Sequence, residues 1–280
     1  MKSIFIKILD FYLYSGFHIA IAAVCIIMQM YLIFDLNADY HYLLFIFAST
    51  SFLYLLHNLL GLNTLLPQCV RDKIKRIARM RTVLIVFLVI MGLISANSFF
   101  YLAPSGQIAV IILAIISLWY VVPVRGKRLR DYPVIKIFLI ALVWSAVACT
   151  GAFPFLKLTI MDKFLLFAER FLIVFAITVP FDIRDMDYDT AQGLSTLPLL
   201  LGKTKSIILA IVSVVIAMFI VAYLHYKGIY NDNSTIALEM GYMLVIIMIY
   251  FSKDKLSDYY FTGVLDSTAI IICFLLWLIK

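Results

Sequence analysis

Residues 206–226 read SIILAIVSVVIAMFIVAYLHY, without a single Asp, Glu, Lys or Arg. About 20 consecutive apolar residues suffice to carry an α-helix across the hydrocarbon core of a bilayer. A segment in that environment must satisfy its backbone hydrogen bonds internally, and a helix does so. The stretch therefore predicts a transmembrane helix.

The rest of the chain repeats this pattern. The apolar runs lie roughly at 12–34, 40–62, 82–103, 106–124, 134–153, 162–181, 206–226, 236–252 and 260–279. Of the 280 residues, 65% are hydrophobic and 14% are charged, whereas a soluble domain is about half apolar and about a quarter charged. A soluble globular domain is thereby excluded. We predict an all-α, polytopic membrane protein of about nine transmembrane helices, forming a single domain over residues 1–280.

The Lys and Arg residues lie mainly between the apolar runs and mostly on one side of the predicted membrane. Of the 23 basic residues, the opposite side receives only Lys157, Lys163, Lys227 and Lys280. The positive-inside rule then places the N-terminus in the cytoplasm and the C-terminus outside, which requires an odd number of helices. Topology thus accounts for the net charge of +7, and no nucleic-acid partner is expected. We predict an integral membrane protein, of the bacterial inner membrane.

A cluster of acids follows the sixth apolar run, on the predicted cytoplasmic side. In PFDIRDMDYD, residues 180–189, the acids Asp182, Asp185 and Asp189 stand at i, i+3 and i+7. This spacing places all three on one face of a continuing helix, with Asp187 directed away from them. Carboxylate oxygens suit Mg²⁺, which takes phosphate oxygens of a substrate as further ligands. A solvated acidic loop is the alternative interpretation.

The acidic stretch continues into Gly193, Thr196-Leu197-Pro198 and Leu201-Gly202-Lys203. The whole segment resembles the second aspartate-rich motif of the UbiA superfamily of intramembrane prenyltransferases, and most of all its menaquinone-type branch. A weaker match is YVVPVRGK, residues 120–127, which resembles the tyrosine–lysine motif after the fourth helix of that family. The nine-helix layout and its orientation are similar too, so the resemblance implies a UbiA-like bundle.

The resemblance implies an enzyme that moves an isoprenyl group from an isoprenyl diphosphate to a hydrophobic acceptor, aromatic or a quinone precursor, with Mg²⁺ as cofactor. It makes Asp182, Asp185 and Asp189 catalytic metal ligands. It assigns further catalytic roles to Tyr120 and Lys127. The residues expected to bind substrate are Asn58, Arg71, Arg125, Arg128 and Lys203.

The sequence departs from the family pattern in the second helix. The first motif of the family has an asparagine followed by aspartates at four-residue spacing, but here Asn58 is followed by Leu62 and Leu66. A second class of function therefore stays open, namely a protein of the same fold that binds prenyl diphosphate or membrane lipid without turnover. A transporter is less favoured, because no inverted pair of broken helices is evident.

Charged residues also occur inside an apolar run. Glu169 and Arg170 lie about three turns before the aspartates. Ionisable residues at that depth are either functional or paired across helices, and the sequence leaves both interpretations open.

Overall fold

The computed structural model describes residues 2–62, 72–123, 126, 129, 132, 134–191, 193–252 and 257–280. The regular elements in these ranges are helices, without a strand, which confirms the all-α prediction. They are α1 (Lys2–Tyr14), α2 (Phe17–Ile33), α3 (Tyr40–Gly61), α4 (Asp72–Arg79), α5 (Arg81–Phe99), α6 (Pro104–Val121), α7 (Ile135–Thr150), η3 (Phe153–Phe155), α8 (Ile160–Ala191), α9 (Leu197–Leu201), α10 (Lys203–Tyr226), α11 (Asp232–Phe251), η4 (Tyr260–Leu265) and α12 (Thr268–Ile279).

Seven helical segments of the described chain are long and apolar enough to cross a membrane. They are α3, α5, α6, α8, α10, α11 and the segment Tyr260–Ile279, which joins η4 to α12. The bent pair of α1 and α2 makes an eighth if it is counted as one span, and α7 is a shorter apolar helix. Each of these elements corresponds to one predicted apolar run. The prediction of a polytopic helical membrane protein is confirmed.

The first predicted run, 12–34, is bent rather than straight. Helices α1 and α2 meet at 52°, and between them Gly16 has φ +83°. A Cβ atom at this position would lie 3.2 Å from the backbone oxygen of Ser51 and from the Cβ of Tyr54. Glycine alone tolerates both the left-handed turn and the close approach of α3. The hydropathy pattern does not show this bend, because the residues on both sides of it are apolar.

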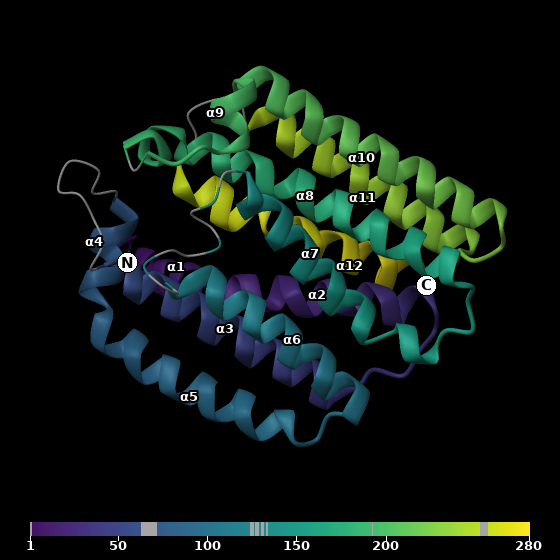
Figure 1. Ribbon diagram of the computed structural model, residues 1–280, viewed down its shortest axis with the longest axis horizontal. Coiled ribbons are helices and arrows are strands. Elements are labelled where there is room, and N and C mark those ends of the chain that lie inside the picture. The colour runs from purple at the N-terminus through teal and green to yellow at the C-terminus, as the bar shows by residue number, and fades with distance from the viewer. Residues whose placement is uncertain are drawn as a thin grey trace.

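Figure 1 shows the long helices running side by side along the longest axis, with α5 along one edge and α10 and α11 along the other. Helix α2 lies between them, in contact with α3, α7 and α12. The short helices α4 and α9 lie at one end of the bundle (Figure 1), and the two chain termini lie toward opposite ends. Termini at opposite ends are what an odd number of crossings produces.

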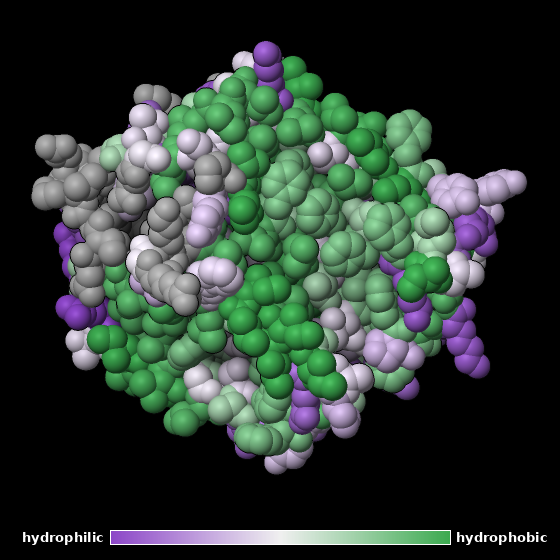
Figure 2. Space-filling view, viewed as in Figure 1, coloured by the Kyte–Doolittle hydropathy of each residue, from purple (hydrophilic) through white to green (hydrophobic). Residues whose placement is uncertain are grey.

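Apolar side chains cover the outside of the bundle. On the face shown in Figure 2, they occupy the middle, and hydrophilic residues gather toward the two ends. Helices α5 and α6 present large exposed hydrophobic side chains such as Val86, Leu93, Ile108 and Ile115. Contiguous apolar surface of this extent is not tolerated in water, so this belt faces lipid.

A polar cluster joins four helices inside the bundle. The Nη1 of Arg170 donates hydrogen bonds to Gln29 Oε1 at 2.9 Å and to the hydroxyl of Tyr242 at 3.3 Å. The Nε of Arg170 lies 3.2 Å from Oε2 of Glu169, and Oε1 of Glu169 accepts a hydrogen bond from the hydroxyl of Tyr242. The amide of Gln29 donates to the carbonyl of Ala269 at 2.9 Å. The intramembrane charges are therefore paired, and they connect α2, α8, α11 and α12.

Candidate active site

A cavity of about 390 Å³ lies between α2, α3, α6, α7, α8 and the last span. Most of its wall is apolar, with contributions from Ile19, Ala22, Ile116, Leu139 and Val174. An apolar cavity with a few converging polar groups is the usual form of a small-molecule site. Its charged or strongly polar lining residues include Tyr54, His57, Tyr120, Lys136, Asp182, Arg184, Asp185 and Asp266.

Helix α8 carries the aspartates past the apolar part of its span. It runs from Ile160 to Ala191 through Pro180, so the predicted continuing helix is confirmed. Asp182 and Asp189 are each 1% exposed, whereas Asp187 is exposed, as the spacing predicts. One face of α8 thus holds buried carboxylates, which need a counter-charge.

Lys136 of α7 supplies that counter-charge. Its Nζ lies 2.5 Å from Asp182 Oδ1 and 3.9 Å from Asp189 Oδ2, and its side chain is 10% exposed. The start of α7 is fixed by Val134, whose φ of 61° is rare for a β-branched residue. The N–H of Val134 donates to the carbonyl of Ser195 at 3.0 Å. The segment after α8 thereby positions the first turn of α7, which carries Lys136.

Arg184 holds the third carboxylate. Its Nε and Nη2 donate to the two oxygens of Asp185 at 2.7 and 3.2 Å. Its Nη1 lies 3.5 Å from Asp258, and its guanidinium lies 5.2 Å from the ring centres of Phe181 and Phe261. A planar guanidinium is suited to both the forked contact and the ring stacking. Asp185 is therefore held in one orientation at the cavity wall.

The last span brings a further carboxylate, that of Asp266, to the cavity. Its first part, η4, is a π-helical turn, in which the N–H of Asp266 donates to the carbonyl of Phe261 at 3.4 Å. The wider turn places Thr262, Leu265 and Asp266 along the cavity wall. π-helical turns occur frequently at functional sites. Asp266 was not among the predicted site residues, although a lone acid at the start of an apolar run is a signal of function.

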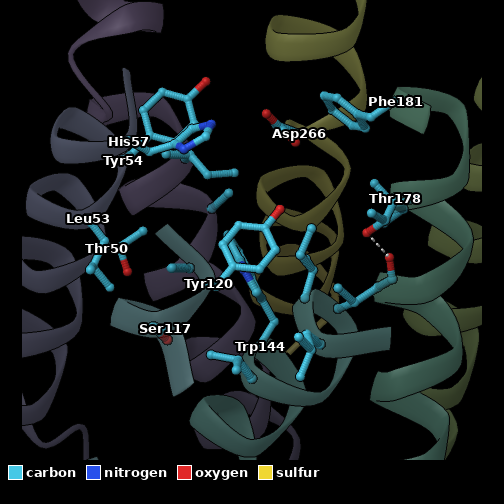
Figure 3. A pocket seen from close by; sticks show the side chains of 18 of the residues that line it. Thr50, Leu53, Tyr54, His57, Ser117, Tyr120, Trp144, Thr178, Phe181 and Asp266 are labelled. Atoms are coloured by element: carbon cyan, nitrogen blue, oxygen red, sulfur yellow. Dashed lines mark hydrogen bonds between the residues drawn. The ribbon is translucent and has the colours of Figure 1, made fainter. Parts of the chain in front are cut away.

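Aromatic residues complete the polar end. Figure 3 shows the ring of Tyr120 inside the cavity, with its hydroxyl directed toward the end where Asp266 lies. Tyr54 and His57 of α3 lie close together beside that end. The structure thus places the predicted Tyr120 in one cavity with Asp182 and Asp185.

The other predicted residues lie elsewhere. Asn58 is buried and its amide donates to the carbonyl of Tyr14 at 3.2 Å, so it joins α3 to α1 and does not line the cavity. Its neighbour His57 does. Lys203 is the first residue of α10, half-buried, outside the cavity lining. The predictions for Arg71, Arg125, Lys127 and Arg128 fall outside the described residues.

The carboxylates fit Mg²⁺ only in a restricted sense. Within the described residues, no group of three His, Cys, Asp or Glu side chains is placed to hold a metal ion by itself. Mg²⁺ in phosphate-handling sites needs only one or two carboxylates, because the substrate supplies further oxygens. Asp182 and Asp185 both line the cavity, and each carboxylate oxygen has a second lone pair. The site therefore suits a metal that binds together with a diphosphate.

Solved structures show what this architecture is similar to. A UbiA homologue from Archaeoglobus fulgidus, bound to GPP and Mg²⁺, has a TM-score of 0.67 and 12% identity, with 96% of this chain and 99% of that chain covered. A UbiA homologue from Aeropyrum pernix has a TM-score of 0.65 and 17% identity, with 94% and 97% covered. A structure described as digeranylgeranylglyceryl phosphate synthase has a TM-score of 0.56 and 16% identity, with 98% and 96% covered.

No family model matches the sequence, and no curated protein matches it. The solved structures show that the chain has the fold of the UbiA superfamily over nearly its whole length. The sequence identities to these structures are 12% and 17%. The predicted resemblance is confirmed at the level of the fold.

Proposed function

We propose that this chain is a membrane prenyltransferase, which moves an isoprenyl group from an isoprenyl diphosphate to a hydrophobic acceptor, either aromatic or a quinone precursor. The observation that carries the proposal is the amphiphilic cavity: an apolar wall for a prenyl tail runs into an end that holds Lys136, Arg184 and three acids, Asp182, Asp185 and Asp266. Similar folds have been solved with GPP and Mg²⁺ and with DMAPP and Mg²⁺, which supports the same class of substrate here.

The charged end performs the electrostatic part of the reaction. Mg²⁺, when bound with the diphosphate, supplies positive charge that stabilises the leaving group. Asp182 and Asp185 would hold it, and Arg184 keeps Asp185 oriented toward the cavity. Preoriented groups of this kind lower the cost of charge development in the transition state. The apolar wall keeps water away from the allylic carbon, and the ring of Tyr120 offers a π-face to its positive charge.

Predicted site residues outside the cavity lining would act at the periphery of the site. Asp189 acts through Lys136, which it contacts. The basic side chains predicted from the sequence would bind phosphate oxygens as charge-assisted donors. These are Arg71, Arg125, Lys127, Arg128 and Lys203, with Asn58 as a further predicted contributor.

Ligand-induced stabilisation tests the proposal. The full chain in detergent is heated with a non-cleavable allylic thiodiphosphate, with and without Mg²⁺. At 100 times its Kd, a ligand stabilises the folded state by about 2.7 kcal/mol. We expect Mg²⁺-dependent stabilisation of the wild type that is lost in Asp185→Ala and kept in Asp187→Ala, because Asp187 is exposed on the same helix. No stabilisation of the wild type would refute the proposal.

A binding protein without turnover is the second candidate, favoured by Leu62 and Leu66 at positions where the family has acids. One assay distinguishes the two functions. It measures the release of diphosphate from a cleavable allylic diphosphate in the presence of aromatic and quinone-precursor acceptors. We expect release by the wild type and none by Asp185→Ala. Mg²⁺-dependent binding without release across the acceptor set would favour the binding protein.

A further inference from the structure

Lys136 occupies the place between two carboxylates where a cation is needed. Its Nζ lies 2.5 Å from Asp182 and 3.9 Å from Asp189, and both acids are 1% exposed. Two buried carboxylates that share one site cannot both stay ionised without positive charge. An ammonium group at the end of a flexible stem is a compact point charge, and here it reaches both acids from the neighbouring helix α7.

The sequence lacks the acids that a second metal ion would need in the second helix. A second metal ion needs carboxylates of its own, yet the second helix has Leu62 and Leu66 after Asn58. No acidic residue occurs between Asp39 and Asp72. Among the residues described by the structure, no three acids or other ligands converge on one point. Among the described residues, the positive charge that contacts both Asp182 and Asp189 is the ammonium of Lys136 on α7.

We propose that Lys136 replaces a metal ion: its ammonium is a built-in cation between Asp182 and Asp189, and the site takes up at most one Mg²⁺, together with the diphosphate and beside Asp185. Uptake of Mg²⁺ together with diphosphate rests on the proposed function. The statement that Lys136 blocks a metal site between Asp182 and Asp189 does not, so it can be tested without any substrate.

The first experiment asks whether removal of the ammonium creates a metal site. Mn²⁺ is titrated into the purified full chain without diphosphate, and bound Mn²⁺ is counted from its electron paramagnetic resonance signal. Mn²⁺ prefers the same oxygen ligands as Mg²⁺. We expect Lys136→Met to bind one more Mn²⁺ per chain than the wild type, because two carboxylates and waters then surround the vacated position. Lys136→Met/Asp189→Asn should lose the gained ion.

Two control variants separate this effect from changes in surface charge. Lys205→Gln removes an exposed lysine of α10 and should bind no more Mn²⁺ than the wild type. Lys136→Arg keeps the charge and should likewise gain no ion. Equal Mn²⁺ binding by folded Lys136→Met and the wild type, or an equal gain in Lys205→Gln, would overturn the proposal.

The second experiment does not depend on any variant folding. The wild type is saturated with the allylic thiodiphosphate, and bound Mn²⁺ is counted again. We expect one ion per chain; two ions would overturn the replacement of a metal by Lys136. If the thiodiphosphate fails to bind while Lys136→Met still gains its ion, the proposed function fails and the role of Lys136 stands.

Discussion

Arg184 connects several side chains of the site through one guanidinium group. Its guanidinium donates to both oxygens of Asp185, lies near Asp258 and lies 5.2 Å from the ring centres of both Phe181 and Phe261. The opposite charges of Asp185 and Asp258 compensate for the burial of the guanidinium. Because these contacts use the planar fork and the ring faces at once, a lysine with the same charge cannot replace them.

We therefore predict that Arg184→Lys lowers the free energy of unfolding by about 1.5–3 kcal/mol, the range for lost hydrogen bonds to a charged group. The measurement is reversible unfolding in mixed micelles. Arg81→Lys is the matched control, because Arg81 is exposed and surface substitutions usually change stability by less than about 0.5 kcal/mol. Similar losses in both variants would show that the fork and the stacking contribute nothing.

The site residues differ in how far the sequence predicts them. Asp182 and Asp185 follow from their spacing on one helix, and Tyr120 from a short motif; the structure brings all three into one cavity. The role of Lys136 is not predicted by the sequence, which shows only a basic residue at the start of an apolar run. Its role depends on contact between the first turn of α7 and the last turns of α8, where Asp182 and Asp189 lie. These two segments are far apart in sequence and meet only in the fold.

At the scale of elements, the apolar runs predict the helices well because hydropathy is a local property of the chain. Irregular features are harder to predict from hydropathy. The bend at Gly16 and the π-helical turn of η4 depend on backbone geometry, and the apolar residues around them do not indicate it. The paired charges of α8 are predicted only in part. The sequence shows that Glu169 and Arg170 lie in an apolar run, but their partners Gln29 and Tyr242 come from two other helices.

This pairing predicts strong coupling between the two charges. Arg170→Met leaves Glu169 buried without its counter-ion and should destabilise the protein by about 3–5 kcal/mol. Glu169→Gln leaves Arg170 in the same state and should cost a similar amount. The double variant removes both charges, so its cost should be clearly smaller than the sum of the two. Additive costs in a double-mutant cycle of unfolding in mixed micelles would contradict the pairing.

For the whole molecule, charge distribution and architecture agree. The termini lie toward opposite ends of the bundle (Figure 1), as an odd number of crossings requires. The described basic residues at the end that carries α4 and α9 include Arg76 and Arg79 of α4 and Lys203 and Lys205 of the first turn of α10. The positive-inside rule predicts that this end, toward which Asp182 and Lys136 of the cavity lie, faces the cytoplasm. A substrate with a diphosphate head would then enter from the cytoplasmic side.

Reporter fusions test this orientation in a bacterial host. We expect alkaline phosphatase fused after Lys280 to be active, because it folds in the periplasm, and a green fluorescent protein fused there to be dark. The same pair fused after Lys205, within the basic end, should show the opposite result. An active phosphatase after Lys205 with a fluorescent C-terminal fusion would mean that the bundle is inserted the other way round.

The π-helical turn of η4 has a consequence for how this site can change over evolutionary time. A π turn contains one residue more than the α-helical turn it replaces, so loss of a single codon within 260–265 would restore a regular helix. Each residue of an α-helix turns the chain by about 100°, and such a deletion would rotate Asp266 away from the cavity without altering one side chain. The carboxylate is therefore kept in place by chain length as much as by residue identity. Relatives that lack this function would be recognised by a gap at this point rather than by a substitution.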